Sequence, residues 1–186
     1  TRPSPPVADG GGDGVDTPRP VMLNTWEAVY FEHDHATLAR LATLAAEVGV
    51  ERFVLDDGWF KNRRNDRAGL GDWTVDEGIF PNGLTPLIDH VKSLGMDFGL
   101  WVEPEMISPD SDLYRAHPDW CLHDESDERP TERNQLVLDL GRQEVWQYIA
   151  DALDALLRDN DIAYLKWDHN RRLFPDNGKQ QQAIHD

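Results

Sequence analysis

Short apolar runs alternate with amphipathic segments along this chain, and this alternation restricts its fold more than any other feature. The runs are short and mostly apolar, as strands are when a parallel sheet is covered on both faces. The segments between them carry apolar residues at helical spacing. Five runs are expected to be strands: Val21–Thr25, Arg52–Leu55, Asp97–Val102, Gln135–Leu140 and Ala163–Trp167.

Three helices are expected between these runs. The first covers Leu38–Val48 and stops at Gly49, a residue suited to a helix C-terminus. The second has Thr85 as its N-cap and Pro86 as its first residue. The third covers about Gln143–Arg158. This βαβα order implies an α/β fold with a parallel sheet and helices outside it.

The residues that follow the strands favour a closed barrel over an open sheet. An open doubly wound sheet predicts a Gly-rich phosphate loop after the first strand, and Trp26-Glu27-Ala28 is not such a loop. The later strands lead into carboxylates and tryptophans, at the strand ends where (β/α)8 barrels build their active sites. These residues are Asp56, Asp57, Trp59, Trp101, Glu103, Trp167 and Asp168.

The length of the chain indicates only part of a barrel. A (β/α)8 TIM barrel takes about 250 residues, whereas this chain has 186. We therefore expect residues 21–174 to form the N-terminal half of a barrel. Residues 1–20 are rich in Pro, Gly and Asp and are expected to be a linker or loop. Residues 175–186 carry no pattern and are expected to be a truncated tail.

Charge and cysteine content restrict the partners and the compartment. A net charge of −17 argues against nucleic acid and anionic membranes, because both are polyanions. The sequence has no apolar run of membrane-spanning length. The one cysteine, Cys121, is expected to be a buried structural thiol. A chain without an internal disulfide is typical of a reducing compartment, so a cytoplasmic location is expected.

Carboxylates beside aromatic rings at strand ends indicate a sugar site. Aromatic faces pack on sugar C–H groups, carboxylates accept hydrogen bonds from hydroxyls, and two carboxyl groups can hydrolyse a glycosidic bond. Lys166, Asp168 and Asn170 share one face if their strand extends that far. The lysine would keep Asp168 ionised, as a nucleophile requires. The alternative is a salt bridge at a strand end.

His33-Asp34-His35 resembles the His-x-His pair of metal-dependent hydrolase barrels. The pair stands where the first helix begins, and no matching histidine pair follows. We therefore interpret Asp34 as a helix cap and both histidines as surface residues. No metal and no organic cofactor is expected.

Six motifs occur in one order along the chain: NTWEAVYF at 24–31, FVLDDGWF at 53–60, LGDW at 70–73, WVEPEM at 101–106, RNQLVLDL at 133–140 and YLKWDHNR at 164–171. With these motifs the chain resembles the bacterial α-galactosidases of glycoside hydrolase family 36, over roughly residues 21–174. The resemblance implies a retaining exo-glycosidase that removes terminal α-linked galactose from sugars such as melibiose and raffinose. It also implies a homo-oligomeric full-length enzyme.

By this resemblance, Asp168 is the nucleophile that forms a covalent galactosyl intermediate. The residues that would bind the sugar or shape its pocket are Asp56, Asp57, Trp101, Arg133, Lys166 and Asn170. Without the resemblance, Arg133 would be interpreted as a solvated loop arginine. The resemblance further implies that Trp120–His123 and Gln135–Leu140 form an added β-hairpin, which leaves four barrel strands in this chain.

The chain also departs from the family pattern. His169 stands where family members usually have Met, and Gly141-Arg142-Gln143 stands where they usually have Ser-Arg-Pro. A retaining enzyme needs a second carboxyl group about 5–5.5 Å from the nucleophile, and in this family an Asp farther downstream supplies it. Only Asp176 and Asp186 follow the nucleophile here, so the fragment alone is expected to be inactive.

Three other functions remain open from the sequence. The first is an α-N-acetylgalactosaminidase or galactosyltransferase that uses the same nucleophile. The second is a fragment that binds galactose without catalysis. The third is a metal-dependent hydrolase.

Overall fold

The computed structural model describes residues 19–123, 129 and 131–172. The expected linker at residues 1–20 therefore lies almost entirely outside the described residues. The expected tail at residues 175–186, with Asp176 and Asp186, lies wholly outside them.

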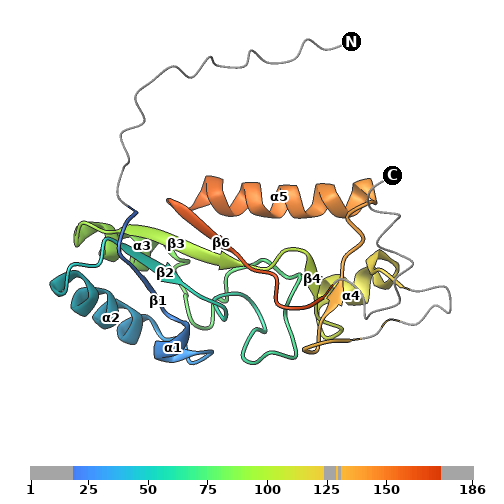
Figure 1. The fold of residues 1–186 in the computed structure, drawn as a ribbon, viewed down its shortest axis with the longest axis horizontal. Helices are drawn as coiled ribbons and strands as arrows, with labels where there is room; N and C mark the ends of the chain where they lie inside the picture. The colour runs from blue at the N-terminus through green and yellow to red at the C-terminus, as the bar shows by residue number, and fades with distance from the viewer. Residues whose placement is uncertain (1–18, 124–128, 130, 173–186) are drawn as a thin grey trace, which may run out of the picture.

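A four-stranded parallel sheet forms the centre of the molecule (Figure 1). Its spatial order, β1-β2-β3-β6, follows the order of these strands along the chain, and each neighbouring pair is parallel. This arrangement is the one expected for consecutive strands of a barrel wall. The strands are β1 (Met22–Asn24), β2 (Arg52–Leu55), β3 (Asp97–Val102) and β6 (Tyr164–Trp167).

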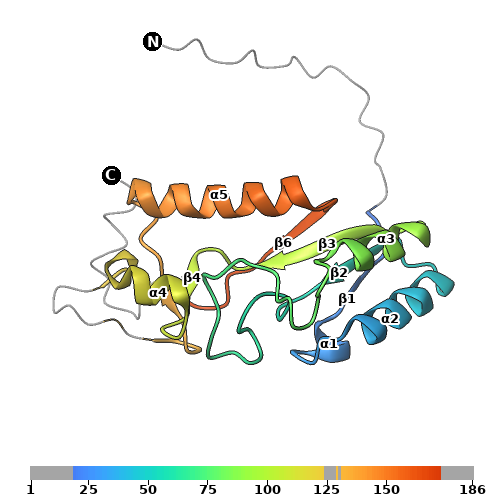
Figure 2. The same cartoon turned by 180° about the vertical axis from the view of Figure 1, so that it is seen from behind.

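Three long helices connect these strands, as the sequence predicts. They are α2 (His35–Glu47), α3 (Thr85–Ser93) and α5 (Gln143–Asp159). Figures 1 and 2 show α2 and α3 close together on one side of the sheet, and α5 beside β6 at the opposite edge. Three shorter helices lie in the loops: α1 (Trp26–Val29), α4 (Asp112–Ala116) and the 3-10 helix η1 (Pro118–Trp120).

The two predicted helix starts have different outcomes. Asp34 caps α2 as predicted, because its carboxylate accepts hydrogen bonds from the backbone N–H groups of Ala36 and Thr37. The prediction for α3 is wrong by one residue: Leu84 is the N-cap, and Thr85 lies inside the helix. The Leu84 side chain is buried in the core, so packing sets this helix start without a side-chain cap.

The main core lies between the helices and one face of the sheet. Alternate strand residues point to this face, because side chains alternate along a strand. The core includes Phe53 and Leu55 of β2, and Phe98, Leu100 and Val102 of β3. The helices contribute Leu38, Ala42, Ala45, Leu87, Ile88, Val91 and Leu156. The first predicted helix, Leu38–Val48, extends one residue too far, because Val48 is the C-cap of α2 and is exposed.

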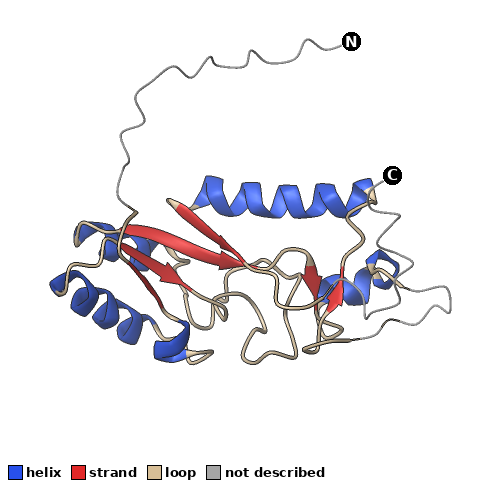
Figure 3. Cartoon of the chain, viewed as in Figure 1, coloured by secondary structure: helices blue, strands red, loops and turns tan. Residues whose placement is uncertain are grey.

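A second small sheet lies in the connection between β3 and α5 (Figure 3). In it β4 (Met106–Ile107) pairs antiparallel with β5 (Leu136–Val137). The predicted hairpin is thus only partly right. Residues 120–122 do lie along residues 137–139, with a bridge between Cys121 and Leu138. However, the only regular strand in Gln135–Leu140 is β5, and its strand partner is β4.

Cys121 is buried between these segments, as expected, in a second apolar cluster that contains Ile107, Leu136 and Ile149. Burial raises the pKa of its thiol to about 11. Among the described residues, no helix is long and apolar enough to cross a membrane.

Candidate active site

The register of the parallel sheet aligns the candidate residues at its carboxyl end. Leu55 pairs with Leu100, and Leu100 pairs with Leu165. The next residue on each of the three strands is therefore in one row, on the sheet face opposite to that of Leu55, Leu100 and Leu165. That row is Asp56, Trp101 and Lys166.

Asp168 follows β6 directly and continues the line of that strand. Its backbone N–H donates to the carbonyl oxygen of Val102 at 2.8 Å, so the ladder continues past the strand. Its Oδ2 accepts hydrogen bonds from Trp101 Nε1 at 2.9 Å and from Asn170 Nδ2 at 2.8 Å. Its Oδ1 accepts from the backbone N–H of His169 at 2.9 Å.

These contacts determine the charge state of Asp168. Burial raises its pKa, but the hydrogen bonds from Trp101, Asn170 and His169, together with the charge of Lys166, lower it by more. The pKa therefore lies below its ordinary value, and the carboxylate is held in the ionised form that a nucleophile needs.

Lys166 pairs directly with Asp56. Its Nζ is 2.6 Å from Asp56 Oδ2, and the Asp56 side chain is almost fully buried. The Asp56 backbone N–H donates to Thr25 Oγ1 at 2.9 Å, which joins this strand end to the end of β1. Lys166 thus contacts one site carboxylate directly and acts on Asp168 through its charge.

Asp57 forms a two-bond ion pair with Arg63. Arg63 Nε lies 2.9 Å from Asp57 Oδ1, and Nη2 lies 2.8 Å from Oδ2. Both side chains are buried. Burial raises the pKa of the Asp57 carboxyl, and the arginine opposes that rise. Sequence reasoning missed Arg63, because it stands in a polar loop that has no periodic pattern.

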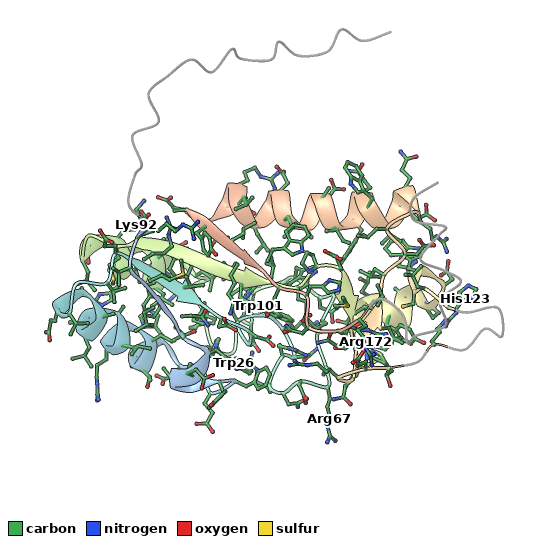
Figure 4. All side chains as sticks on the ribbon, viewed as in Figure 1. Trp26, Arg67, Lys92, Trp101, His123 and Arg172 are labelled. Carbon is green, nitrogen blue, oxygen red and sulfur yellow. The ribbon has the colours of Figure 1, made fainter. Side chains whose placement is uncertain are left out.

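An aromatic cluster holds the Trp101 side chain. The Phe60 ring stacks parallel to it with 6.3 Å between ring centroids, and the Trp73 ring lies 6.4 Å away. Trp59 Nε1 donates to the Trp101 carbonyl oxygen at 2.9 Å. Trp101 lies within the molecule rather than at its surface (Figure 4). The cluster therefore fixes the direction in which the indole N–H reaches Asp168.

Arg133 is the one candidate that stands apart from this group. It occupies the tip of a two-residue turn, in which Arg133 and Asn134 both have positive φ, at 54° and 60°. Glu132 and Gln135 exchange backbone hydrogen bonds across the turn. The Arg133 side chain is exposed. In the described part of the chain, one hydrogen bond links Lys166 to Asp56, two others link Trp101 and Asn170 to Asp168, and none of them involves Arg133.

The prediction that His33 is a surface residue is wrong. His33 is 7% exposed, and its ring lies under Gly58, at the turn that follows Asp57. Across the described residues, neither ring nitrogen has a hydrogen-bond partner. Burial, helped by the charge of Arg64, lowers its pKa to about 4. No periodic pattern around residue 33 indicated this burial, and His35, two residues away, is exposed as predicted.

The site thus places an ionised carboxylate beside an indole N–H group and near a partly buried Asp–Lys pair. Within residues 19–123, 129 and 131–172, no group of three or more His, Cys, Asp or Glu side chains could hold a metal ion.

Comparisons with known proteins all indicate the same family. The family model described as melibiase matches residues 13–185. An α-galactosidase of Escherichia coli is 56% identical over 155 residues, which cover 83% of this chain and 22% of that protein. The α-galactosidase AgaA of Geobacillus stearothermophilus is 51% identical over 158 residues, covering 85% of this chain and 22% of its own.

Solved structures agree in fold. The crystal structure of the GH36 α-galactosidase AgaA from Geobacillus stearothermophilus matches with a TM-score of 0.79 and 52% identity, over 82% of this chain and 21% of that one. A variant of AgaA in complex with raffinose matches with the same TM-score and 51% identity, over the same shares of both chains. The chain thus spans about a fifth of the length of the curated relatives it matches.

Proposed function

This chain belongs to the melibiase family, and from that premise we propose that it is the part of an α-galactosidase that carries the catalytic nucleophile. The observation that carries the proposal is the environment of Asp168. Its carboxylate is ionised, oriented by Trp101 and Asn170, and placed beside the Asp56–Lys166 pair. The substrates would be terminal α-galactosides such as melibiose and raffinose, and raffinose is bound in a related structure.

In this proposal Asp168 attacks the anomeric carbon of galactose. The bond between that carbon and the glycosidic oxygen breaks, and a second carboxyl group gives its proton to the departing sugar. Water then attacks the covalent intermediate, loses a proton to the same carboxyl group and releases galactose with retained configuration. The second carboxyl group would come from sequence outside this chain.

The other polar groups would bind hydroxyls of the galactose ring. Asp56 and Asp57 present carboxylate oxygens that accept hydrogen bonds, while Lys166, Arg133 and Asn170 present donors. Trp101 would form an apolar wall. For Arg133 this role requires the turn at residues 132–135 to face the bound sugar.

The wider organisation is part of the same proposal. Residues 21–174 would form the first half of a (β/α)8 barrel, and flanking sequence would supply the other half. Support comes from the parallel sheet with four strands in chain order, which a barrel wall requires. We further propose a cytoplasmic homo-oligomer as the full-length enzyme.

The test uses the natural protein that contains these residues, with its flanking sequence. Wild type and Asp168→Gly are assayed on an activated aryl α-galactoside, and azide is added to the variant. We expect the variant to be inactive and azide to restore turnover with β-galactosyl azide as product. Asp161→Gly, at an exposed aspartate before β6, is the matched control and should keep wild-type activity.

Other results would replace the proposal. Full activity in Asp168→Gly would exclude this residue as the nucleophile and direct attention to Asp56, Asp57 and Glu103. Galactose binding without turnover in the wild type would favour a binding protein. Faster turnover of the 2-acetamido substrate, or transfer to sucrose, would favour the related activities. Loss of activity with a chelator would favour a metal-dependent hydrolase.

A further inference from the structure

Glu103 is a fully buried carboxyl group that the proposed mechanism does not use. It follows β3 directly, and its relative exposure is 0%. Since Val102 pairs with Trp167, Glu103 lies beside Asp168 in the continuation of the sheet. A buried carboxyl group is unfavourable unless it is hydrogen-bonded, so its partners indicate what it does.

One oxygen of Glu103 holds the segment that follows the nucleophile. Glu103 Oε1 accepts a hydrogen bond from the backbone N–H of Asn170 at 2.6 Å. The side chain of the same Asn170 donates to Asp168 Oδ2 at 2.8 Å. Glu103 therefore fixes the backbone of the residue whose amide orients the nucleophile.

The other oxygen of Glu103 holds the turn that carries Arg133. Glu103 Oε2 accepts a hydrogen bond from Gln135 Nε2 at 3.2 Å. Gln135 closes the two-residue turn through its backbone, and Arg171 Nη1 also donates to its carbonyl oxygen. The two residues at the tip have positive φ, a conformation that is costly for residues other than Gly and needs support from the surroundings.

We propose that Glu103 is a positioning residue, which joins the Asn170 segment and the Arg133 turn and so sets the geometry of both around Asp168. This inference rests on the function proposed above. Among the described residues, the hydrogen bonds from Asn170 N–H and Gln135 Nε2 to Glu103 come from neutral amide groups. The role therefore depends on two acceptor oxygens at defined positions rather than on negative charge.

A substitution that preserves shape separates these two possibilities. In Glu103→Gln, the new amide oxygen can still accept from the Asn170 N–H. The new NH₂ group can donate to Gln135 Oε1 once the Gln135 amide turns over. That oxygen is free for this purpose, because in the described chain it is buried without a hydrogen-bond partner. In Glu103→Ala both links are lost.

The experiment measures kcat, KM and Tm of the full natural protein on an aryl α-galactoside. We expect Glu103→Ala to lower kcat by roughly 100-fold, the order of loss for a misplaced catalytic group. Glu103→Gln should remain within about fivefold of wild type, since it restores both hydrogen bonds. Val91→Ala, in the core on the other face of the sheet, is the control for stability. It should lower Tm without changing kcat.

A second variant tests the link to the turn by itself and does not depend on Glu103→Ala folding. Gln135→Ala leaves the Asn170 contact in place. It should raise KM by about tenfold with little change in kcat, because only sugar binding by the Arg133 turn is affected. Equal losses in Glu103→Gln and Glu103→Ala would overturn the proposal in favour of a role for the charge. Wild-type kcat in a folded Glu103→Ala would also overturn it.

A structural readout keeps this inference separate from the proposed function. If the wild-type protein has no α-galactosidase activity, the proposed function fails. Crystal structures of the variants still decide the positioning role. The contact between Asn170 Nδ2 and Asp168 Oδ2 should persist in Glu103→Gln and be lost in Glu103→Ala. Its persistence in Glu103→Ala would refute the inference whatever the activity of the enzyme.

Discussion

Arg63 shows how strongly a single residue can control this site. Its guanidinium group lies beneath the surface, binds both oxygens of Asp57 and also donates to the carbonyl oxygen of Ala68 at 2.9 Å. A bidentate arginine fixes the orientation of a carboxylate as well as its charge. The Asp57 oxygens that would meet a sugar hydroxyl are therefore oriented by a residue outside the strand ends.

Removal of Arg63 leaves Asp57 as a buried carboxylate without its cation. We expect Arg63→Ala to lower the free energy of unfolding by about 3–5 kcal/mol, the usual effect of breaking a buried ion pair. Denaturant unfolding of the full protein measures this loss. Lys61→Ala is the control, because its pair with Asp112 is exposed. It should cost no more than about 1 kcal/mol, and equal losses would contradict the prediction.

His33 should make stability depend on pH. Its pKa falls from the ordinary value of 6.5 to about 4 on folding, because burial disfavours the charged ring. The unfolded chain therefore binds more protons than the folded one between these pH values. The contribution of neutral His33 to the free energy of unfolding is fully present above pH 6.5. It decreases as the pH falls toward 4, by about 1.4 kcal/mol for each pH unit.

The variant His33→Phe tests this pH dependence. It keeps an aromatic ring under Gly58 and removes both ring nitrogens. We expect the difference in unfolding free energy between the variant and the wild type to grow as the pH is lowered from 6.5 to 4. His35→Phe, at an exposed position, should follow the wild type. A constant difference across this range would show that His33 does not remain neutral.

Among the secondary-structure elements, the two predicted helix caps, Asp34 and Thr85, allow a direct comparison of a residue that caps its helix with one that does not. Asp34 accepts two backbone hydrogen bonds at the start of α2, while Thr85 makes no side-chain cap in the described structure of α3. Asp34→Ala should therefore lower the free energy of unfolding by about 1 kcal/mol. Thr85→Ala should change it by less than about 0.5 kcal/mol. Thermal unfolding of both variants checks the order, and a larger effect at Thr85 would contradict it.

At the scale of the whole molecule, the two outer strands of the sheet decide whether the chain can fold alone. β1 and β6 are the edges of the described sheet, and Trp167 at the end of β6 is 52% exposed. Unpaired edges of parallel strands with apolar side chains favour association over folding. In a complete barrel, neighbouring strands would cover both edges.

We therefore expect residues 1–186 alone to melt without a cooperative transition and to show no α-galactosidase activity. Addition of the flanking sequence should restore both properties. Circular dichroism during heating and an aryl α-galactoside assay provide the measurements. A cooperative transition with strong activity from these residues alone would show that the chain closes in another way.

The amino-acid sequence alone predicted the three long helices and the four parallel strands of the main sheet, but not β4 or the short helices. β2 and β3 have the predicted bounds, and four parallel strands follow chain order, because apolar periodicity and Gly stops act over a few neighbouring residues. It also indicated Asp56, Lys166 and Asp168 as strand-end neighbours, because parallel strands bring their carboxyl ends to one edge. The roles of these residues stay predictions.

The partners of the site residues became visible only in the folded chain. The burial of His33, the pairing of Asp57 with Arg63, and the link from Glu103 to Gln135 and Asn170 join segments that are irregular in sequence. Loop sequences carry no periodic pattern, so the contacts of their side chains cannot be predicted from neighbouring residues. These contacts depend on where the sheet places the ends of each loop. Strand bounds follow from local patterns, whereas these contacts depend on distance in the folded chain.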